Sequence, residues 1–265
     1  TCNIDSGRRW MLNNAAGLPV CTWDNLHNAT RIYYDELLRP LETWVQTPDT
    51  FGAIRVREYK YGKQAGYNRI GKLLAVYDES GETNNLIFDF DGNVISQEKA
   101  FNTVYDHLEP SQSGCNFYGI ITQWQYDAMQ RPVQITFPNG SVQQMGYNKA
   151  GLPETVSLDQ NDYITNIYYN EKGQKTLIEF GNNTKTEYWY DLNTHRLIRL
   201  KTTKNSSNNS LQDLNYTYDA VGNIVEINDL AQETTYYNNA PIEPRHLYTY
   251  DALYRILSGT GRELI

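Results

Sequence analysis

The residue types that most often carry catalysis are sparse in this sequence and lie far apart along it. Four histidines occur without a His-Glu-x-x-His pattern, namely His27, His107, His195 and His246. No Gly-x-Ser-x-Gly motif supplies a nucleophile elbow. Ser96 and Lys99 match a Ser-x-x-Lys pattern, but so loose a pattern arises readily by chance, and we expect Ser96 to lie in a turn or loop. The sequence predicts no catalytic residue, and we expect the chain not to be an enzyme.

The sequence also contains no motif typical of a metal or cofactor site. Cys2, Cys21 and Cys115 have no CxxC spacing, so neither a disulfide framework nor a zinc site is indicated. Residues 89–93 have a calcium-loop composition but lack the closing glutamate, which predicts a turn instead. Residues 259–261 are too short for a phosphate loop. We therefore expect no cofactor and no bound metal.

The charge balance excludes one large class of partner. A net charge of −8 with no basic run argues against a nucleic-acid groove, which needs clustered Lys and Arg. No segment approaches the ~18 apolar residues of a membrane span, and no signal peptide is visible. The chain starts without Met and stops within a repeat, so we expect it to be a section of a larger protein.

A Tyr-Asp step recurs along the whole chain. It occurs at Tyr34-Asp35, Tyr77-Asp78, Tyr126-Asp127, Tyr190-Asp191, Tyr218-Asp219 and Tyr250-Asp251, and as Tyr-Asn at Tyr147-Asn148 and Tyr169-Asn170. Successive tyrosines of this series lie at regular intervals: 21 residues separate Tyr126 from Tyr147, 22 separate Tyr147 from Tyr169, and 21 separate Tyr169 from Tyr190. Such a period is typical of repeat proteins, in which each unit stacks on its neighbours to bury its apolar face.

Each repeat has the pattern of a β-hairpin. In residues 186–191 the tyrosines alternate at period two, and residues 196–200 resume the extended pattern after a short turn. Asp or Asn at the end of the first strand can bond the backbone two residues on. Gly151, Gly173 and Gly222 would supply the positive φ of a tight reversal. We expect the repeat-defining positions to be structural: Tyr34, Asp35, Tyr126, Asp127, Tyr190, Asp191, Tyr218, Asp219, Gly222, Tyr250 and Asp251.

These motifs resemble Rhs or YD repeats. Residues 126–132 and 250–256 share Tyr-Asp-Ala and a following arginine, and residues 218–224 read Tyr-Asp-Ala-Val-Gly-Asn-Ile. The N-terminal stretches 5–8, 12–14, 17–19, 22–24 and 34–40, and the tail stretches 211–214, 250–255 and 261–263, are similar to the Rhs region of insecticidal toxin complex B and C components. In that family, long sheets of such repeats coil into a hollow shell that encloses a cytotoxic polypeptide.

The expected fold class is therefore all-β, with tandem YD-repeat hairpins that form a long curved sheet, a section of an Rhs-type shell. We expect residues 1–265 to be one continuous array. The abundance of Tyr over Phe, 22 against 7, favours cross-strand packing with hydroxyls that reach water or a partner. Residues 62–66, 109–114 and 204–210 are expected to be loops, and residues 96–108 fit either a short helix or a strand.

The resemblance implies a structural section of a toxin-encapsulating shell in a secreted toxin complex. The implied partners are other parts of the same shell or a partner toxin-complex subunit, together with the enclosed toxin polypeptide. The family's aspartic-protease element, which releases the toxin, has no matching Asp-Pro-rich signature here. An alternative is an adhesion module that presents the same repeats to carbohydrate or a cell-surface receptor. A hypervariable toxin encoded beyond the repeats would favour the encapsulating shell. A membrane anchor or a neighbouring sugar-binding domain would favour the adhesion module.

Overall fold

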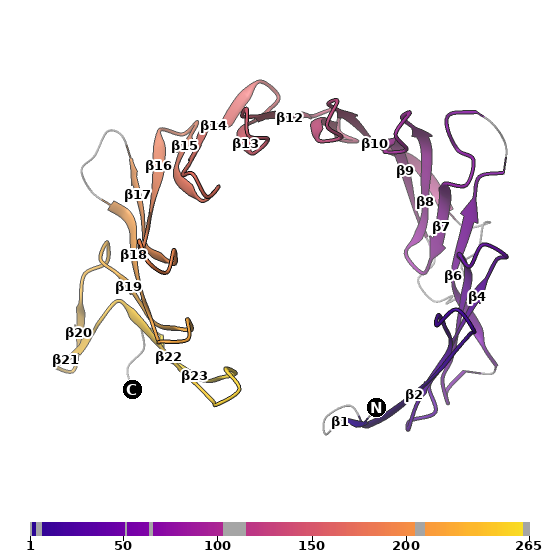
Figure 1. Ribbon diagram of the computed structural model, residues 1–265, viewed down its shortest axis with the longest axis horizontal. Coiled ribbons are helices and arrows are strands. Elements are labelled where there is room, and N and C mark those ends of the chain that lie inside the picture. Colours follow the sequence, from indigo (N-terminus) through magenta and orange to yellow (C-terminus); the bar gives the residue numbers. More distant parts are fainter. Residues whose placement is uncertain are drawn as a thin grey trace. The chain divides into compact units, whose positions relative to one another are not determined.

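The computed structural model describes residues 2–3, 7–50, 52–63, 66–102, 115–204 and 210–261. All regular secondary structure in these residues is β-strand, and none of them lies in a helix (Figure 1). The all-β fold class is thus confirmed. No helix in these ranges is long and apolar enough to cross a membrane. Backbone proximity divides the chain into two compact units, Thr1–Val142 and Gln143–Ile265. The expectation of a single continuous array stays a prediction.

Unit 1 is an antiparallel meander in which every strand pairs with the next one in the chain. Its strands are β1 (Cys2–Asn3), β2 (Gly7–Asn13), β3 (Pro19–Asp24), β4 (Ala29–Tyr34), β5 (Pro40–Gln46), β6 (Ile54–Tyr61), β7 (Leu73–Asp78), β8 (Gly81–Phe88), β9 (Val94–Asn102), β10 (Cys115–Tyr126) and β11 (Pro132–Thr136). Short turns between sequential strands allow this topology, because antiparallel neighbours need no crossover.

Unit 2 continues in the same manner, with one insertion. Its strands are β12 (Val142–Tyr147, which begins at the boundary), β13 (Pro153–Leu158), β14 (Asn161–Tyr169), β15 (Lys175–Phe180), β16 (Thr184–Tyr190), β17 (Leu197–Lys204), β18 (Ser210–Tyr218), β19 (Ile224–Asp229), β20 (Thr235–Tyr237), β21 (Ala240–Ile242), β22 (Arg245–Tyr250) and β23 (Ile256–Gly259). Strands β20 and β21 form a separate hairpin, and β19 pairs with β22 across it.

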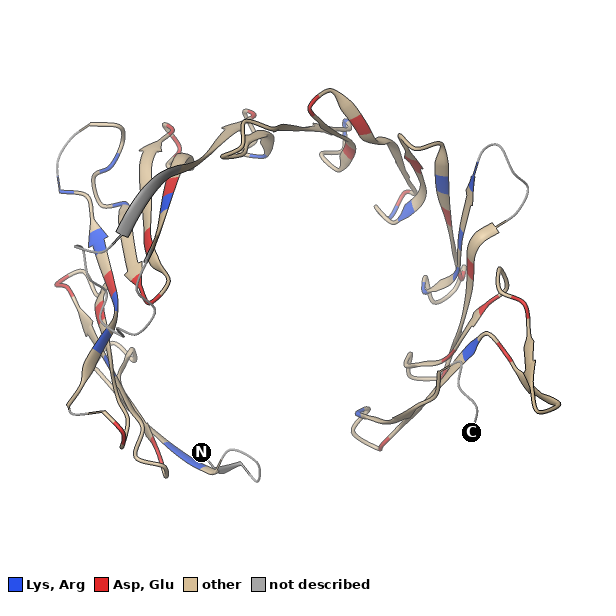
Figure 2. Cartoon of the chain, turned by 180° about the vertical axis from the view of Figure 1, so that it is seen from behind, with Lys and Arg blue, Asp and Glu red and all other residues tan. Residues whose placement is uncertain are grey.

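Neither unit has a thick core. The buried apolar side chains among the described residues are few: Ala75, Tyr77, Phe88 and Ala100 in unit 1, and Ile167 and Ile178 in unit 2. A sheet whose faces are both near solvent retains half-buried side chains on each of them, and tyrosine suits this position because its ring packs while its hydroxyl stays polar. Acidic and basic residues are interleaved along the strands of both units (Figure 2).

Two loop expectations need correction, and one open alternative is resolved. Ser96 lies in β9 and is buried, opposite Gln123 of β10, so it is not in a loop. The pairing of β9 with both β8 and β10 favours the strand over a helix, which settles residues 96–102; residues 103–114 lie outside the described part of the chain. Lys204 and Ser210 are strand ends of β17 and β18 rather than loop residues, and residues 205–209 are not described.

Candidate functional site: the joints between hairpins

The aspartates of the Tyr-Asp steps close tight turns. In residues 127–131, the Asp127 amide donates to the Arg131 carbonyl at 3.0 Å and the Gln130 amide donates to the Asp127 carbonyl at 3.0 Å. The Asp127 carboxylate Oδ1 accepts from the amides of Met129 at 2.8 Å and Arg131 at 3.0 Å. One side chain thus satisfies two amides that the reversal leaves without strand partners.

The second carboxylate oxygen binds the side chain of the fifth turn residue. Arg39, Arg131 and Arg255 donate from Nε to Asp35, Asp127 and Asp251 at 2.8, 2.7 and 2.6 Å. Asn223 donates from Nδ2 to Asp219 at 2.8 Å. We call these five-residue reversals YD turns: residues 35–39, 127–131, 219–223 and 251–255. The Asp191 turn is one residue longer, and there Thr194 supplies both an amide and a hydroxyl to Oδ1.

The fourth residue of every YD turn has a left-handed backbone. The values of φ are 61° at Leu38, 61° at Gln130, 111° at Gly222 and 62° at Tyr254. Gly151 and Gly173, at the same place in the Tyr-Asn repeats, have φ of 82° and 75°. The positive φ predicted at Gly151, Gly173 and Gly222 is therefore observed. The first and fifth residues of each turn are hydrogen-bonded to each other, so the loop proper consists of the three residues between them. A three-residue loop whose last residue is left-handed is typically followed by a β-bulge, which explains the register shifts beside these turns.

The tyrosines join each hairpin to the one before it. Each hydroxyl donates to the backbone carbonyl of the first residue of a strand in the preceding hairpin. The bonds run from Tyr34 to Pro19 at 2.8 Å, Tyr126 to Val94 at 3.1 Å, Tyr190 to Lys175 at 2.9 Å, Tyr218 to Leu197 at 2.7 Å and Tyr250 to Ile224 at 2.7 Å. We call each such bond a tyrosine joint. All five predicted tyrosines take part in one.

Arginines add a second connection that the sequence reasoning missed. The Arg39 guanidinium lies 4.1 Å from the centroid of the Tyr61 ring and donates to the Gly71 carbonyl at 3.1 Å. Arg196 donates to the Val221 carbonyl at 3.1 Å and lies 5.6 Å from the Tyr218 ring centroid. Neighbouring turns are therefore bonded to one another. The signal was present in the sequence, because both arginines occupy the last position of their turn.

Local hydrogen bonding sets the ionisation of the turn aspartates. The Arg131 side chain, and then its amide, lower the pKa of Asp127. For Asp251 the Arg255 amide is the largest cause of a lowered pKa, followed by the Arg255 side chain. Burial instead raises the pKa of the Tyr190 and Tyr218 hydroxyls. At neutral pH the aspartates accept as carboxylates and the tyrosines donate as neutral phenols, which are the forms that both kinds of bond require.

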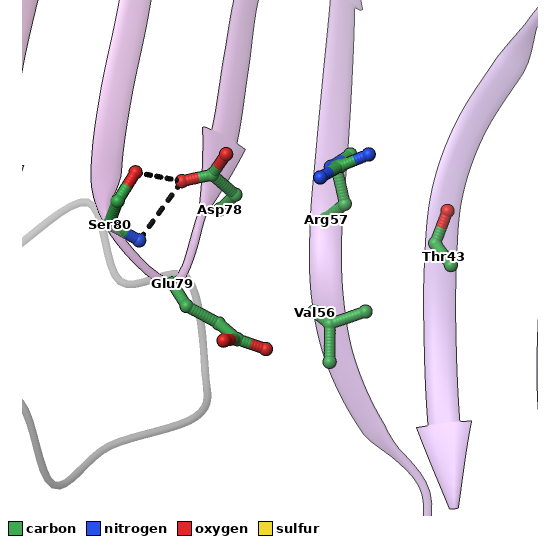
Figure 3. Close-up of a pocket in the computed structure, with 6 residues that line it drawn as sticks. All are labelled: Thr43, Val56, Arg57, Asp78, Glu79 and Ser80. Carbon is green, nitrogen blue, oxygen red and sulfur yellow. Dashed lines mark hydrogen bonds between the residues drawn. The ribbon is translucent and has the colours of Figure 1, made fainter. Parts of the chain in front are cut away.

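The remaining Tyr-Asp step differs. Tyr77 is buried and Asp78 pairs with Gly81 across a two-residue turn, at the opposite strand ends from the YD turns. An open hollow beside this turn is lined by Thr43, Val56, Arg57, Asp78, Glu79 and Ser80 (Figure 3). There Ser80 bonds the Asp78 carboxylate from its hydroxyl at 2.5 Å and its amide at 3.0 Å. No histidine or cysteine lines the hollow, so its polar groups form a turn rather than a nucleophile with a base.

His195 and Cys21 have structural surroundings, one in a turn and the other in strand β3. His195 lies in the Asp191 turn, where its ring contacts the Lys172 ammonium and its carbonyl accepts from Gln174 at 2.9 Å. Cys21 is a free thiol. In the part of the chain that the structure describes, no group of three or more His, Cys, Asp or Glu residues could hold a metal ion. The geometry at the joints can hold strands in register, and it contains no activated nucleophile.

No protein-family model matches the chain. The chain is similar in sequence to two curated proteins of Yersinia entomophaga. Toxin subunit YenC1 is 28% identical over 288 residues, and toxin subunit YenC2 is 31% identical over 304 residues. Both alignments cover 100% of this chain, which spans 29% and 31% of the length of these relatives. The resemblance to toxin-complex components is confirmed.

Solved structures give the same result for the fold. The crystal structure of TcdB2-TccC3-Cdc42 matches with a TM-score of 0.81 at 29% identity, over 98% of this chain and 13% of that chain. The Photorhabdus luminescens Tc holotoxin pore matches with a TM-score of 0.80 at 29% identity, with the same coverage. The described hairpins thus have the fold of the Rhs region in toxin-complex subunits, and the chain's relatives are toxin subunits.

Proposed function

We propose that this chain is a structural section of a toxin-encapsulating β-sheet shell in a secreted toxin complex. In this role it sequesters a cytotoxic polypeptide before delivery. Its partners are other parts of the same shell or a partner toxin-complex subunit, and the enclosed polypeptide. The site of action is extracellular, as part of the complex.

The row of tyrosine joints is the observation that carries the proposal. A wall must keep its strands in register over a long distance without a thick core. Each unit achieves this with backbone pairing between sequential strands and with hydroxyl bonds that link one hairpin to the previous one. We propose that the repeat-defining tyrosines and aspartates serve this purpose. Sequestration then needs no reactive side chain, because a wall of paired strands protects an enclosed polypeptide by steric exclusion of proteases.

A chimaera tests the proposal. The segment of TcdB2-TccC3 that aligns with this chain is replaced by residues 1–265, and the purified complex is treated with proteinase K. We expect the C-terminal region of TccC3 to stay protected while it is enclosed. An assembled chimaera of normal size whose C-terminal region is digested as fast as the free polypeptide would contradict the wall role.

A matched chimaera separates wall integrity from mere assembly. It carries Tyr190→Ala and Tyr218→Ala, which remove two joints in unit 2. We expect faster digestion of the enclosed region in this variant than in the chimaera with the natural sequence. Equal protection in both would show that the joints are dispensable for closure.

A further inference from the structure

The first strands of unit 1 carry several aromatic side chains on one face. Residues directly opposite each other in antiparallel strands project on the same side of a sheet. Trp10 of β2 is opposite Trp23 of β3, and Arg31 of β4 is opposite Trp44 of β5. Cys21 links the two pairs, because it is opposite Leu12 on one side and Arg31 on the other. The aromatic platform consists of Arg8, Trp10, Leu12, Trp23, Arg31, Tyr33 and Trp44.

This platform is accessible to solvent. The exposed fractions are 42% for Trp10, 39% for Trp23, 49% for Tyr33 and 56% for Leu12. The Trp10 and Trp23 rings stack with centroids 6.3 Å apart and an interplanar angle of 10°. Three of the five tryptophans of the chain thus lie on this one face. A clustered apolar surface of this kind marks an interaction site, whereas single exposed apolar residues do not.

The charge of the platform is positive, although the chain as a whole is acidic. Arg8 and Arg31 are exposed, and among the described residues no carboxylate forms an ion pair with either. Glu42, opposite Tyr33, is the nearest acid on this face by register. It is already engaged by Arg55 at 3.1 Å and by the Trp44 indole nitrogen at 2.9 Å. The two guanidinium groups therefore remain available for an acidic partner.

We propose that the aromatic platform binds an extended polypeptide segment that carries both apolar and acidic side chains. Trp, Tyr and Arg are the residues that dominate binding energy at protein interfaces. The platform carries two guanidinium groups without an ion-pair partner among the described residues, and an acidic side chain can neutralise their charge whereas a neutral sugar cannot. These features favour a peptide over a carbohydrate. This inference goes beyond the proposed wall role, because it concerns binding by a defined surface. It holds for any segment with these side chains, whether or not that segment is enclosed.

Unit 2 offers a matched control. Trp189 is exposed to 38%, nearly the same as Trp23, and Arg199 lies 5.1 Å from its ring centroid. Here the arginine is not available, because Asp213 accepts from its Nε and Nη2 at 2.7 Å each. This tryptophan has a comparable exposure and a neighbouring cation, but that cation is neutralised. Loss of Trp189 should therefore leave peptide binding unchanged.

The test measures the fluorescence anisotropy of labelled peptides with the full chain. The probe is a peptide of roughly eight residues of Glu, Phe, Ser and Gly, long enough to cross four strands spaced about 4.8 Å apart. A second peptide has Lys in place of Glu, and an unlabelled β-linked glucose oligomer is added as a competitor. The variants are Arg31→Glu, Trp23→Ala and Trp189→Ala, each checked by circular dichroism and thermal melting.

We expect the Glu peptide to bind the natural sequence at least about tenfold more tightly than the Lys peptide. Arg31→Glu should weaken binding by about tenfold or more, with a nearly unchanged melting temperature, since this exposed side chain forms no hydrogen bond or ion pair within the described residues. Trp189→Ala should bind as the natural sequence does. The proposal is overturned if the Glu peptide does not bind, if Arg31→Glu binds equally well, or if the glucose oligomer displaces the peptide and proves to be the better ligand.

Discussion

A single phenolic hydroxyl fixes one hairpin to the hairpin before it. The Tyr190 hydroxyl donates to the Lys175 carbonyl, and the Tyr218 hydroxyl donates to the Leu197 carbonyl. Each acceptor lies at the first residue of a strand, next to a turn, where the backbone would otherwise rely on water. The ring of the same tyrosine provides the apolar contact. One residue thus supplies both the packing and the polar bond of a joint.

Removal of the hydroxyl alone should weaken the fold measurably. We expect Tyr190→Phe to lower the free energy of unfolding by about 1 kcal/mol, the usual net value of one hydrogen bond whose acceptor is left unpaired. Chemical denaturation measures this change. Tyr163→Phe is the control, because Tyr163 is 58% exposed and its hydroxyl has no hydrogen bond within the described residues. Equal losses for both variants would show that the joint contributes nothing specific.

The turn aspartates make stability depend on acid pH. Their pKa values are lowered in the folded chain, as for Asp127 through Arg131 and for Asp251 through Arg255. A group with a lowered folded pKa stabilises the protein above its unfolded pKa of about 3.9, and this contribution is lost as the pH falls through the folded value. We therefore expect the melting temperature to fall steeply below about pH 4.

Neutral turn variants should reduce that pH dependence. Asp127→Asn keeps an acceptor for the turn amides but cannot titrate. The fall in melting temperature between neutral and acid pH should be smaller for this variant than for the natural sequence. Asp49→Asn is the control, since Asp49 is exposed and its carboxylate has no hydrogen bond or ion pair within the described residues. A variant slope as steep as that of the natural sequence would exclude Asp127 as a source of acid sensitivity.

The YD turn is the element that sets the register of each hairpin, and its key feature is a left-handed residue at the fourth position. Gly222 has φ of 111°, and a methyl group added there would lie 2.4 Å from a nitrogen of the Arg196 guanidinium. Gln130, at the equivalent place, adopts φ of 61° with a full side chain. The conformation is thus imposed by the turn as a whole, and glycine only makes it easier to reach.

Substitution at these two positions should have unequal effects. Gly222→Ala should cost about 1 kcal/mol or more, because alanine is strained at positive φ and must displace Arg196. Gln130→Ala should change stability by less than about 0.5 kcal/mol, since the side chain is exposed and the backbone is already that of a non-glycine residue. Thermal melts of both variants decide the point. A larger loss at Gln130 than at Gly222 would contradict the argument.

The hairpins and their turns could be predicted from sequence because they depend on local chemistry. The alternation of tyrosines, the aspartate at each strand end and the glycines at positive φ all act within about six residues. The tyrosine joints could not be predicted, since the acceptor carbonyl of Tyr218 is 21 residues away and carbonyls carry no sequence signal. Ser96 was misassigned for a similar reason. A small polar residue in a strand resembles a loop residue until its partners on β8 and β10 are known.

At the scale of the whole molecule, each of the two units is built from strands that pair with their neighbours in sequence. In unit 2, β23 pairs with β22 on one side and has no partner on its other side among the described residues. Its Ile256 and Leu257 are 64% and 68% exposed. An edge strand with unpaired amides and apolar side chains is a template for another strand. Isolated chains should therefore associate.

Association should depend on that edge. We expect the sedimentation coefficient of the natural sequence to rise with concentration, and Leu257→Lys to shift the chain toward monomers, because a lysine on an edge strand opposes pairing. Leu230→Lys is the control, since Leu230 is 60% exposed in a turn and adds the same charge away from the edge. If the natural sequence sediments as a monomer at all concentrations, the exposed edge of β23 does not pair with a second chain, and the prediction is wrong.

The tyrosine joint also bears on how such a chain can change length during evolution. Each joint uses the same donor atom and the same kind of acceptor at 2.7 to 2.9 Å, as Tyr190, Tyr218 and Tyr250 show. A duplicated or deleted hairpin of about 21 residues, the spacing from Tyr169 to Tyr190, therefore meets compatible neighbours on both sides. The gene can gain or lose whole units without redesign of the tyrosine joints, and the extent of the sheet becomes a quantity that selection can adjust in discrete steps.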